Sequence, residues 1–581
     1  MKKIELSLNK KILLLLSPLQ KIKAAVLVFL MFVSSLMEVI NLGLLIVIMN
    51  FFLESEDKNE NSLIYGFLNN FVSDKENSLL LILLVFFTIF FLKIILLIYL
   101  SWLEAGFIAR FKERLSNNIF KNFLSRNVYQ VLKKNSSEYL RNFTTEIDLT
   151  TAFYFSTLRI ILDIILVITL FIFLTFFDLL TSVSTIVVLT ILSLTYYLIV
   201  KNFISSWGTK RLYSQKKKVQ FVNESFSAIK YIKILSREKY FANRFKIQNF
   251  SLFKINFNMS FIAALPKFVL ELFLFISILF ILIILLLNNY EYQEIVKIVS
   301  IYIVVSFRLI PSANRILTNI QNIKYTYPAF KNIFNETQIK NAPENINVKK
   351  FFFNKEISIN IKKFNYNLQS KFFLKNIKFK INKKEKIGII GSSGCGKSTL
   401  IDIICGFIKI NNGDVFVDKK SIYNNLNGWQ NQIGYIPQQI VILNDSLRNN
   451  ILFGLDNKNY NDSKLRNILK KVNLKDFYTQ LPNGLNEKIS EEGLNISGGE
   501  VQRIGIARAL VNNPQIIFLD EATSALDTFT ENTILKEINS LKKTVIFVSH
   551  RITALRYCDK IYRIEKGQIK DSGNFKKFIN V

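Results

Sequence analysis

The chain has 581 residues, half of them hydrophobic, with a mean hydropathy of +0.26 and a formal net charge of +32. This composition is too apolar for an ordinary soluble protein and predicts membrane-spanning segments. A single histidine excludes a metal site built from several histidines, and three cysteines confined to the last third exclude a disulfide framework.

The N-terminus, MKKIELSLNKKILLLLSPLQKIK, is basic and contains a short apolar patch. It lacks the small-residue cleavage site of a secretory signal peptide. We therefore expect an amphipathic helix that lies in the membrane interface and is retained.

Six long apolar segments follow in the first 320 residues. A helix of about 20 residues crosses the roughly 30 Å hydrocarbon core of a bilayer, and each segment is long enough. They are residues 24–53, 79–103, 156–177, 179–200, 261–288 and 295–320. The fold class predicted for residues 1–335 is an all-α transmembrane domain of six helices.

The segments between these spans differ in charge. Residues 104–155 carry eight Lys or Arg, and residues 201–260 include KKK at 216–218, whereas residues 54–77 carry six acidic residues and two lysines. The positive-inside rule places both termini and the two basic loops in the cytoplasm, with the chain in the inner membrane. This topology accounts for much of the net charge, so no nucleic-acid partner is predicted.

The two basic loops keep recurring apolar residues and lack Gly and Pro punctuation, which predicts helical extensions of the spans. Residues 336–350 are polar and read as a linker. From residue 351 to 581, short apolar runs such as KIGIIG, QIIFLDE and TVIFVSH alternate with helical stretches. Such alternation predicts an α/β domain with a mainly parallel sheet.

A phosphate-binding motif, G-x-x-x-x-G-K-S, runs from Gly391 to Ser398 between an apolar strand and a helix. Glycines let backbone N–H groups surround phosphates, and the helix N-terminus adds its positive end. Lys397 is expected to reach the β- and γ-phosphates, and Ser398 to ligate Mg²⁺.

Two further motifs follow. IIFLDE (516–521) is an apolar strand that ends in two carboxylates, of which Asp520 can hold Mg²⁺ and Glu521 can act as general base. In LNISGGE, Ser497, Gly498 and Gly499 open a helix whose N-terminus suits an anion.

This ordered set of motifs resembles the nucleotide-binding domain of ABC transporters over residues 351–581. GSSGCGKST resembles the Walker A motif, ISGGE the signature, IIFLDE the Walker B motif, IPQQ the Q-loop, FNYN the aromatic loop and ALD the D-loop. The last member of the set is a switch histidine after the next strand, and His550 stands there.

The resemblance implies that ATP and Mg²⁺ are bound and that ATP is hydrolysed. The catalytic residues that it predicts, together with the motifs above, are Glu521, His550 and Gln438. The predicted metal ligands are Ser398, Gln438 and Asp520. The predicted nucleotide-binding residues are Tyr366, Gly391, Ser392, Ser393, Gly394, Cys395, Gly396, Lys397, Ser398, Thr399, Ser497, Gly498, Gly499 and Asp527.

The signature departs from the usual LSGGQ at two positions, with Ile496 for Leu and Glu500 for Gln. We expect neither to abolish activity, since the first is an apolar exchange and Glu500 lies past the start of the helix. One signature and one Walker A motif per chain imply a homodimer with ATP between two subunits. The chain is thus predicted to be a half-transporter of the exporter type.

Charged residues within spans are costly and are therefore candidates for function. Arg159 with Asp163, and Lys267 with Glu271, have the i,i+4 spacing at which opposite charges can neutralise each other. The full set is Glu38, Lys93, Arg159, Asp163, Lys267, Glu271, Arg308 and Arg315. Cations outnumber anions in this set, and no acid lies within a turn of Arg308 or Arg315, which predicts an anionic cargo.

The segment RLIPSANR (308–315) resembles the bacterial lipid-linked oligosaccharide flippases of N-glycosylation. The resemblance implies that a polyprenyl-pyrophosphate-linked oligosaccharide is moved from the inner to the outer leaflet. Its predicted contacts are Lys93, Lys267, Arg308 and Arg315, with lysine at 93 and 267 where arginine is usual. Two alternatives stay open, namely export of another cargo (a peptide, drug or lipid) and a membrane-anchored regulatory ATPase.

Overall fold

In the computed structural model, the description covers residues 8–53, 75–176, 179–288, 290–339, 351–366, 373–456, 460–489, 496–521, 527–549 and 552–579. The chain divides into two compact units. The first contains Met1–Arg126 and Leu132–Asn341, and the second contains Asn127–Val131 and Ala342–Val581.

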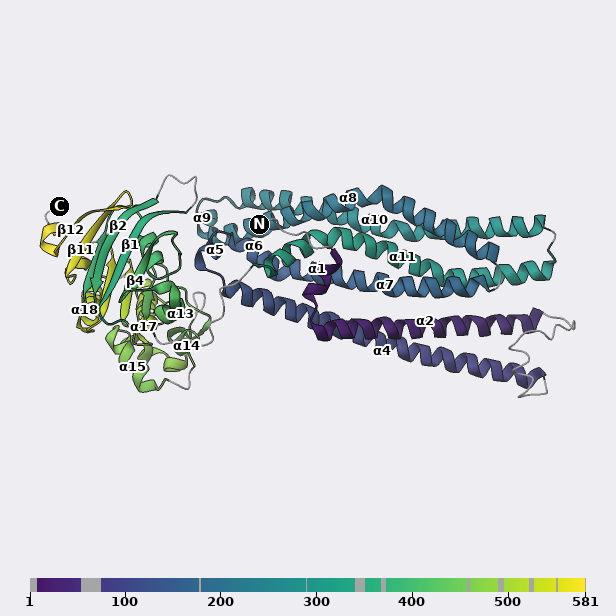
Figure 1. Cartoon of the computed structure of the whole chain (residues 1–581), viewed down its shortest axis with the longest axis horizontal. Coiled ribbons are helices and arrows are strands. Elements are labelled where there is room, and N and C mark those ends of the chain that lie inside the picture. Colours follow the sequence, from purple (N-terminus) through teal and green to yellow (C-terminus); the bar gives the residue numbers. More distant parts are fainter. Residues whose placement is uncertain are drawn as a thin grey trace. The chain divides into compact units, whose positions relative to one another are not determined.

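The first unit, which we call the helical unit, consists of long helices that run side by side (Figure 1). Most of their residues are apolar, so few polar side chains compete with the backbone for hydrogen bonds. The elements are α1 (Leu8–Leu15), α2 (Pro18–Leu53), α4 (Lys75–Leu124), α6 (Ser136–Arg141), the π-helix η1 (Asn142–Glu146), α7 (Ile147–Thr175), α8 (Leu179–Ser227), α9 (Ile229–Ile234), α10 (Glu238–Leu287) and α11 (Tyr292–Thr337).

Each of the six predicted spans lies on one of the six longest of these helices. Among the described residues, four helical segments have the length and hydropathy of a membrane span, namely Pro18–Ile48, Leu79–Leu124, Ser136–Thr175 and Glu238–Leu287. The spans predicted at 179–200 and 295–320 lie on α8 and α11 and remain predictions as spans. The predicted helical extensions are present, since α4, α8 and α10 continue well into the basic loops.

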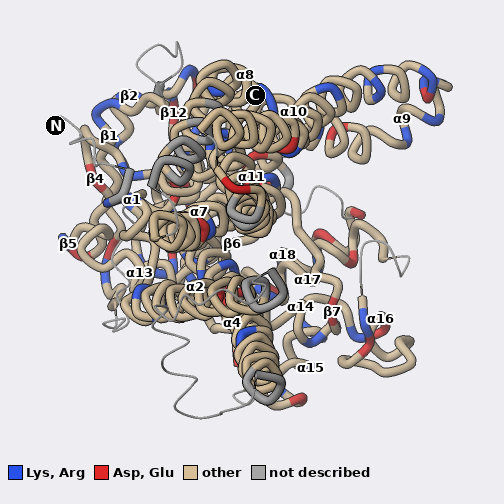
Figure 2. The backbone as a smooth tube through the Cα atoms, turned by 90° about the vertical axis from the view of Figure 1, so that its right-hand side faces the viewer, with Lys and Arg blue, Asp and Glu red and all other residues tan. Residues whose placement is uncertain are grey.

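Aromatic packing joins the helices of this unit. The rings of Phe153 on α7 and Phe330 on α11 are stacked with their centroids 4.5 Å apart, and both side chains are fully buried. Large apolar side chains elsewhere, such as Phe87, Phe91 and Phe275, are more than 60% exposed. Exposed apolar surface on this scale suits a hydrocarbon environment. Figure 2 shows that Lys and Arg positions recur along the segment that carries α9.

The second unit, which we call the ATPase unit, is built on two sheets. The four-stranded sheet has the order β2-β1-β4-β5 and the six-stranded sheet has the order β12-β11-β3-β10-β9-β6. The strands of the larger sheet are β3 (Lys386–Ile390), β6 (Ile433–Ile436), β9 (Ile516–Asp520), β10 (Thr544–Val548), β11 (Lys560–Glu565) and β12 (Gln568–Gly573). Those of the smaller sheet are β1 (Glu356–Asn365), β2 (Phe373–Asn382), β4 (Asn412–Val417) and β5 (Lys420–Ser421).

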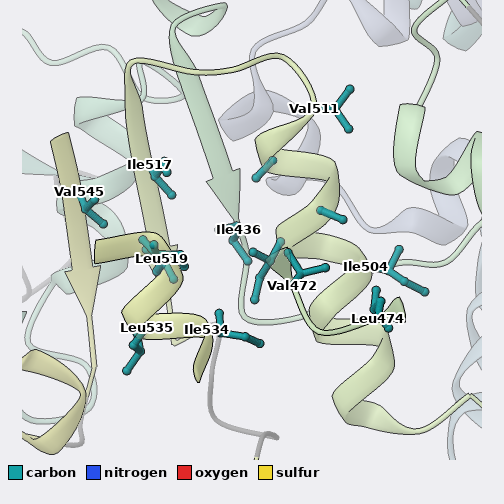
Figure 3. Packing of buried hydrophobic residues seen from close by; sticks show 14 of the residues in the cluster. Ile436, Val472, Leu474, Ile504, Val511, Ile517, Leu519, Ile534, Leu535 and Val545 are labelled. Carbon is teal, nitrogen blue, oxygen red and sulfur yellow. The ribbon is translucent and has the colours of Figure 1, made fainter. Parts of the chain in front are cut away.

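The larger sheet is parallel except for β12, which pairs antiparallel with β11. Every residue of β9 and β10 is buried, because hydrophobic clusters cover both faces of the sheet. Figure 3 shows one of these clusters, in which Ile517 and Leu519 of β9 lie near Ile436 and Val545. The predicted α/β domain with a mainly parallel sheet is therefore confirmed.

Helices of the ATPase unit flank this sheet. Those used below are α12 (Lys397–Ile404), α17 (Gly498–Leu510) and α18 (Thr528–Ser540). One short element comes from the loop between two helices of the other unit, since Asn127–Val131 groups with the ATPase unit. These residues include most of α5 (Val128–Leu132).

Candidate functional site

The predicted catalytic groups gather where parallel strands end. The phosphate loop follows β3, Asp520 and Glu521 end β9, and Gln438 lies two residues beyond β6. In the register of the sheet, Val548 of β10 is opposite both Asp520 and Ile389. The carboxyl ends of these neighbouring strands therefore lie at one edge, the usual ligand site of open α/β sheets.

The phosphate loop depends on glycine conformations. Gly394 and Gly396 have φ of +75° and +108°, which disfavour L side chains. At Gly391 a Cβ would lie 2.3 Å from the Ile564 carbonyl oxygen and 2.6 Å from Cys395 Sγ, so no side chain fits. The following helix, α12, begins at Lys397, whose Nζ donates to the carbonyls of Gly391 at 2.8 Å and Ser392 at 3.0 Å.

Asp520 and Glu521 point to different partners although they are adjacent. Glu521 has a φ of +52°, a strained conformation that breaks the alternation of the strand. Its Oε2 accepts a hydrogen bond of 2.9 Å from Gln438 Nε2, and Asp520 accepts one from the Tyr435 hydroxyl. The predicted general base and the Q-loop glutamine are thus in direct contact.

Negative charge is concentrated beside the phosphate loop. Burial, together with the charge of Asp520, raises the pKa of Asp402 on α12 to about 6. Burial and the charge of Glu521 raise the pKa of Asp520, while Lys397 opposes this shift. Among the described residues no cluster of three or more acidic, His or Cys side chains could hold a metal by itself, so a cation ligated by Asp520 would take most of its ligands from nucleotide phosphates.

Tyr366 lies at the end of β1 and is held by contacts on two sides. Its hydroxyl lies 2.9 Å from Thr399 Oγ1, and its ring centroid lies 5.6 Å from that of Tyr129. The Tyr129 hydroxyl also donates to the Tyr366 carbonyl oxygen at 2.8 Å. Tyr129 belongs to the α5 segment and was not predicted from the sequence, which offers no sign that a tyrosine in a basic loop would reach the aromatic loop.

The signature residues form the N-terminus of α17. Ser497 is the N-cap residue, and it exchanges hydrogen bonds with Glu500 in a capping box: Glu500 N donates to Ser497 Oγ at 3.3 Å, and Ser497 N donates to Glu500 Oε2 at 2.8 Å. The Ser497 hydroxyl also donates to Glu500 Oε2, at 2.8 Å. Asp527 caps α18 by accepting from Thr530 N at 2.9 Å.

The remaining predicted residues differ in accessibility. Ser392, Ser393 and Ser398 are exposed, whereas Cys395 and Thr399 are buried in the loop and its helix. His550 lies outside the described residues, as do residues 522–526 of the D-loop region. The strand that leads to His550, β10, ends at Val548 beside β3 and β9.

A second polar site lies within the helical unit, in a chamber of about 360 Å³ between α2, α4, α7 and α11. Of the described charged residues, four basic and three acidic ones line it. These are Lys93, Arg159, Arg308 and Arg315 with Glu38, Glu104 and Asp163. Predicted cargo residues 93, 308 and 315 therefore converge, whereas Lys267 is on α10 and is not among the lining residues.

Ion pairs between helices connect the charges of this chamber. Glu38 on α2 pairs with Lys93 on α4 and, at 2.8 Å, with Arg308 on α11. The i,i+4 pairing that the spacing allows between Arg159 and Asp163 is not formed, because each bonds to another helix: Arg159 Nε to Glu104 at 3.0 Å, and Asp163 to Arg315 at 2.7 Å.

The i,i+4 pairing of Lys267 and Glu271 is confirmed only as a long contact of 4.0 Å between largely exposed side chains. Arg308 and Arg315 have no acid nearby in sequence, yet both are paired, because α2 and α7 bring carboxylates to α11. Glu104 was missed from the sequence because it lies just past the end of the predicted span.

An ATP-binding fold with a P-loop, joined to a helical membrane unit, defines a class of membrane transport ATPases. Residues 374–524 match the ABC transporter family, and residues 24–309 match the ABC transporter transmembrane region. The chain thus belongs to the ABC transporters, with the transmembrane region and the ATPase domain in one polypeptide. The ATPase domain of this family hydrolyses ATP.

Relatives and solved structures agree with this assignment. An export ATP-binding/permease protein of Rickettsia typhi is 39% identical over 198 residues, which are 34% of each chain. A multidrug export ATP-binding/permease protein of Staphylococcus aureus is 38% identical over 202 residues, 34% of this chain and 35% of that one. The matches thus span about a third of the length of these relatives.

The structure is similar to that of a bacterial Atm1-family ABC exporter with ATP bound, with a TM-score of 0.77. The two chains are 19% identical over 97% of this chain and 96% of the other. At this identity the similarity establishes the fold, which is a helical transmembrane domain followed by an ABC ATPase domain.

Proposed function

We propose that the chain is an ATP-driven exporter that moves an amphiphilic anion, in the form of a polyprenyl-pyrophosphate-linked oligosaccharide, from the inner to the outer leaflet. The observation that carries this proposal is the pair of half-exposed arginines, Arg308 and Arg315, on the face of α11 that lines the chamber. Arginine offers a planar set of donors that matches phosphate oxygens.

The opposite face of α11 lines an apolar pocket, which is evidence that the cargo has an apolar portion. A pocket of about 330 Å³ lies between α7, α8 and α11, lined mostly by apolar side chains such as Val167, Leu194, Leu309 and Ile316. One helix thus presents a cationic face to one cavity and an apolar face to another. A lipid with a phosphorylated headgroup has the complementary division.

ATP would be bound by the ATPase unit of one subunit and by the signature of its partner in a homodimer. Lys397 and the loop N–H groups would hold the phosphates, Tyr366 would stack on the adenine, and Glu521 would accept a proton from the attacking water. His550 would bond to the γ-phosphate. Mg²⁺, held by Ser398, Asp520 and Gln438 with the phosphates, would neutralise charge that develops on the phosphate oxygens.

The test is transport by the purified full chain in proteoliposomes, with a pyrophosphate-linked glycolipid as cargo. Neutralising both α11 arginines, Arg308→Gln with Arg315→Gln, should greatly reduce movement of the glycolipid while ATP binding persists. Lys267→Gln is the matched control, because this lysine is outside the chamber. Transport that ignores the double replacement would overturn the proposed cargo.

A second candidate function is export of a drug or another lipid. The names of the Staphylococcus relatives, which refer to multidrug export, favour it. The same proteoliposomes distinguish the two, since a cationic or neutral drug would be moved without the arginines. ATP hydrolysis with no movement of glycolipid, lipid, peptide or drug would instead favour a regulatory ATPase.

A further inference from the structure

The two chamber arginines of α11 are held in the same way. Arg308 Nε lies 2.8 Å from Glu38 Oε1, and Arg315 Nε lies 2.7 Å from Asp163 Oδ1. The carboxylate side chains are only 8% and 5% exposed, whereas the arginine side chains are 51% and 41% exposed. In both pairs a buried acid on another helix holds an arginine that faces the chamber.

Contact through Nε has a geometric consequence. A guanidinium carries five donors in a fixed plane, so an acid at Nε occupies one edge and leaves the terminal nitrogens at the other end. Arg315 is fixed further, because its Nη2 donates to Ser312 Oγ at 2.9 Å. Each arginine is therefore anchored on its protein side with the end of its side chain towards the chamber.

Lys93 completes the arrangement around Glu38. It is 4% exposed, pairs with the second oxygen of Glu38 and lies 5.5 Å from the centroid of the Phe90 ring. Because it is buried, Lys93 is poorly placed to touch a cargo molecule. Its charge instead offsets that of Glu38, so Arg308 keeps its full attraction for an anion.

Arg159 in the same chamber provides the contrast. Its Nε and Nη2 both bond to Glu104, each at 3.0 Å, and its guanidinium lies 4.4 Å from the Phe155 ring centroid. Both oxygens of Glu104 thus take a donor of Arg159, so the whole carboxylate faces this guanidinium. On Arg308 and Arg315 the acid is placed at Nε, and the Nη2 of Arg315 donates to a neutral hydroxyl instead of to a carboxylate. Glu104 therefore neutralises its arginine, whereas Glu38 and Asp163 direct theirs.

We propose, on the basis of the function proposed above, that Glu38 and Asp163 are positioning residues that aim Arg308 and Arg315 at the phosphate oxygens of an anionic headgroup. Lys93 is then the counter-charge of Glu38 and not a ligand of the cargo. If the acids position the arginines, replacing an acid should weaken anion binding, which is the opposite of what the change in net charge alone predicts. Removing an acid leaves the chamber more positive, which by charge alone would tighten anion binding.

The experiment measures ATPase stimulation of the full chain in phosphatidylcholine nanodiscs by farnesyl pyrophosphate, with farnesol as the uncharged comparison. Glu38→Ala and Asp163→Ala should raise the half-maximal concentration of farnesyl pyrophosphate on the order of 10-fold, as loss of an orienting partner does at other sites. Glu38→Gln should lie between wild type and Glu38→Ala, because its amide oxygen still accepts from Arg308 but no longer pairs with Lys93.

Two matched controls separate positioning from charge. Glu104→Gln removes an acid from the same chamber and should leave the half-maximal concentration unchanged or lower it. Glu271→Gln removes an acid on α10 that does not line the chamber, and should change nothing. Basal ATPase activity and the melting temperature report folding. If Glu38→Ala fails these checks, Glu38→Gln and Asp163→Asn decide the result.

The outcomes separate this inference from the function on which it rests. The positioning role is wrong if the Glu38 and Asp163 variants respond at a lower half-maximal concentration of farnesyl pyrophosphate than wild type. The two acids would then compete with the anion for the arginines. If wild type does not respond to farnesyl pyrophosphate and Arg308→Gln behaves like wild type, the proposed anionic cargo is wrong and the positioning role falls with it.

Discussion

The ATPase unit and the helical unit differ in how their charged side chains are arranged: acidic groups lie next to one another in the first, and opposite charges are paired in the second. Beside the phosphate loop, burial and then the charge of Asp520 raise the pKa of Asp402, and burial and then the charge of Glu521 raise the pKa of Asp520. In the chamber of the helical unit, each of the four described cations forms an ion pair with a carboxylate. One site concentrates like charge and the other balances it.

The physical reason lies in what each site meets. A nucleotide binds together with a divalent cation, whose positive charge offsets the repulsion between neighbouring carboxylates. This repulsion therefore acts only in the nucleotide-free protein. The chamber lies among spans in a medium of low dielectric, where an unpaired charge is costly. Arg159 and Arg315 have the same exposed fraction of 41%, so it is the way in which the carboxylate holds each arginine, and not exposure or the lack of a partner, that distinguishes them in the helical unit.

The largest expected effect concerns the crowded carboxylates of the ATPase unit. Glu521→Gln should slow ATP hydrolysis by at least about 100-fold, because loss of a general base costs two or more orders of magnitude. Binding of a fluorescent ATP analogue should persist. His550→Ala should behave alike, with binding retained through Tyr366 and Lys397. Phosphate release is the measurement, and Glu537→Gln on the exposed side of α18 is the control. Turnover near wild type would refute the assignment.

The next prediction tests the balanced charges of the helical unit. Arg126 Nη1 lies 2.7 Å from Glu336 Oε2, and both side chains are at least 94% buried. Glu336→Gln removes the carboxylate charge opposite Arg126, although Arg126 Nη2 keeps its bond to the carbonyl oxygen of residue 336, and should cost about 3 kcal/mol, the usual loss when one partner of a buried pair is removed. Thermal melting in detergent should show it. Asp148→Asn, which breaks an exposed pair with Lys112, should cost under about 1 kcal/mol.

The same pair gives a pH dependence with a definite sign. Burial of Glu336 opposes ionisation, but hydrogen bonds from Lys134 and Arg126 outweigh it and lower its pKa from the ordinary 4.5. The unfolded chain then binds the proton more readily, so the stabilisation is present above pH 4.5 and is lost as pH falls through the lowered pKa. The melting temperature of Glu336→Gln should therefore be less sensitive to pH below 4.5. Equal sensitivity in the two proteins would contradict this.

A smaller effect is expected where α5 meets the aromatic loop. Tyr129→Ala removes both a ring contact and a hydrogen bond to Tyr366, and should raise the KM for ATP about 5-fold, since an aromatic pair contributes roughly 1 kcal/mol. Tyr129→Phe keeps the ring and should lie nearer wild type. Steady-state ATPase measurements check this. An unchanged KM in the alanine variant would show that Tyr366 is held without Tyr129.

The smallest effect concerns Glu500, the acidic departure in the signature. Glu500→Ala loses half of the capping box and should destabilise α17 by about 1 kcal/mol, while Glu500→Gln keeps it and should be close to neutral. ATPase activity of Glu500→Gln within about twofold of wild type is expected, and chemical denaturation of the two variants measures the difference in stability. A large gain in activity for Glu500→Gln would mean that the carboxylate restrains the Ser497 hydroxyl.

The ATP site was predictable because its groups belong to contiguous motifs. Residues 391–396 form a loop because all six are small and lie between a strand and a helix. Asp520 lies where the strand ends because a buried apolar run precedes it. Parallel strands then place their carboxyl ends together, so Gln438 and Glu521 meet although they are 83 residues apart. Tyr129 was not predictable, because it lies 237 residues before Tyr366 in the chain and no motif marks it as a neighbour of the aromatic loop.

What the sequence determined by itself was the class of each segment: helices that are apolar along a membrane-spanning length, strands that are buried, and glycine-rich turns that bind phosphate. These follow from short-range periodicity and backbone sterics. Only the tertiary structure decided which charges pair. Asp163 lies four residues from Arg159, yet it bonds to Arg315, 152 residues away. The packing of the helices determines which oppositely charged side chains come within bonding distance, and the spacing along the sequence does not.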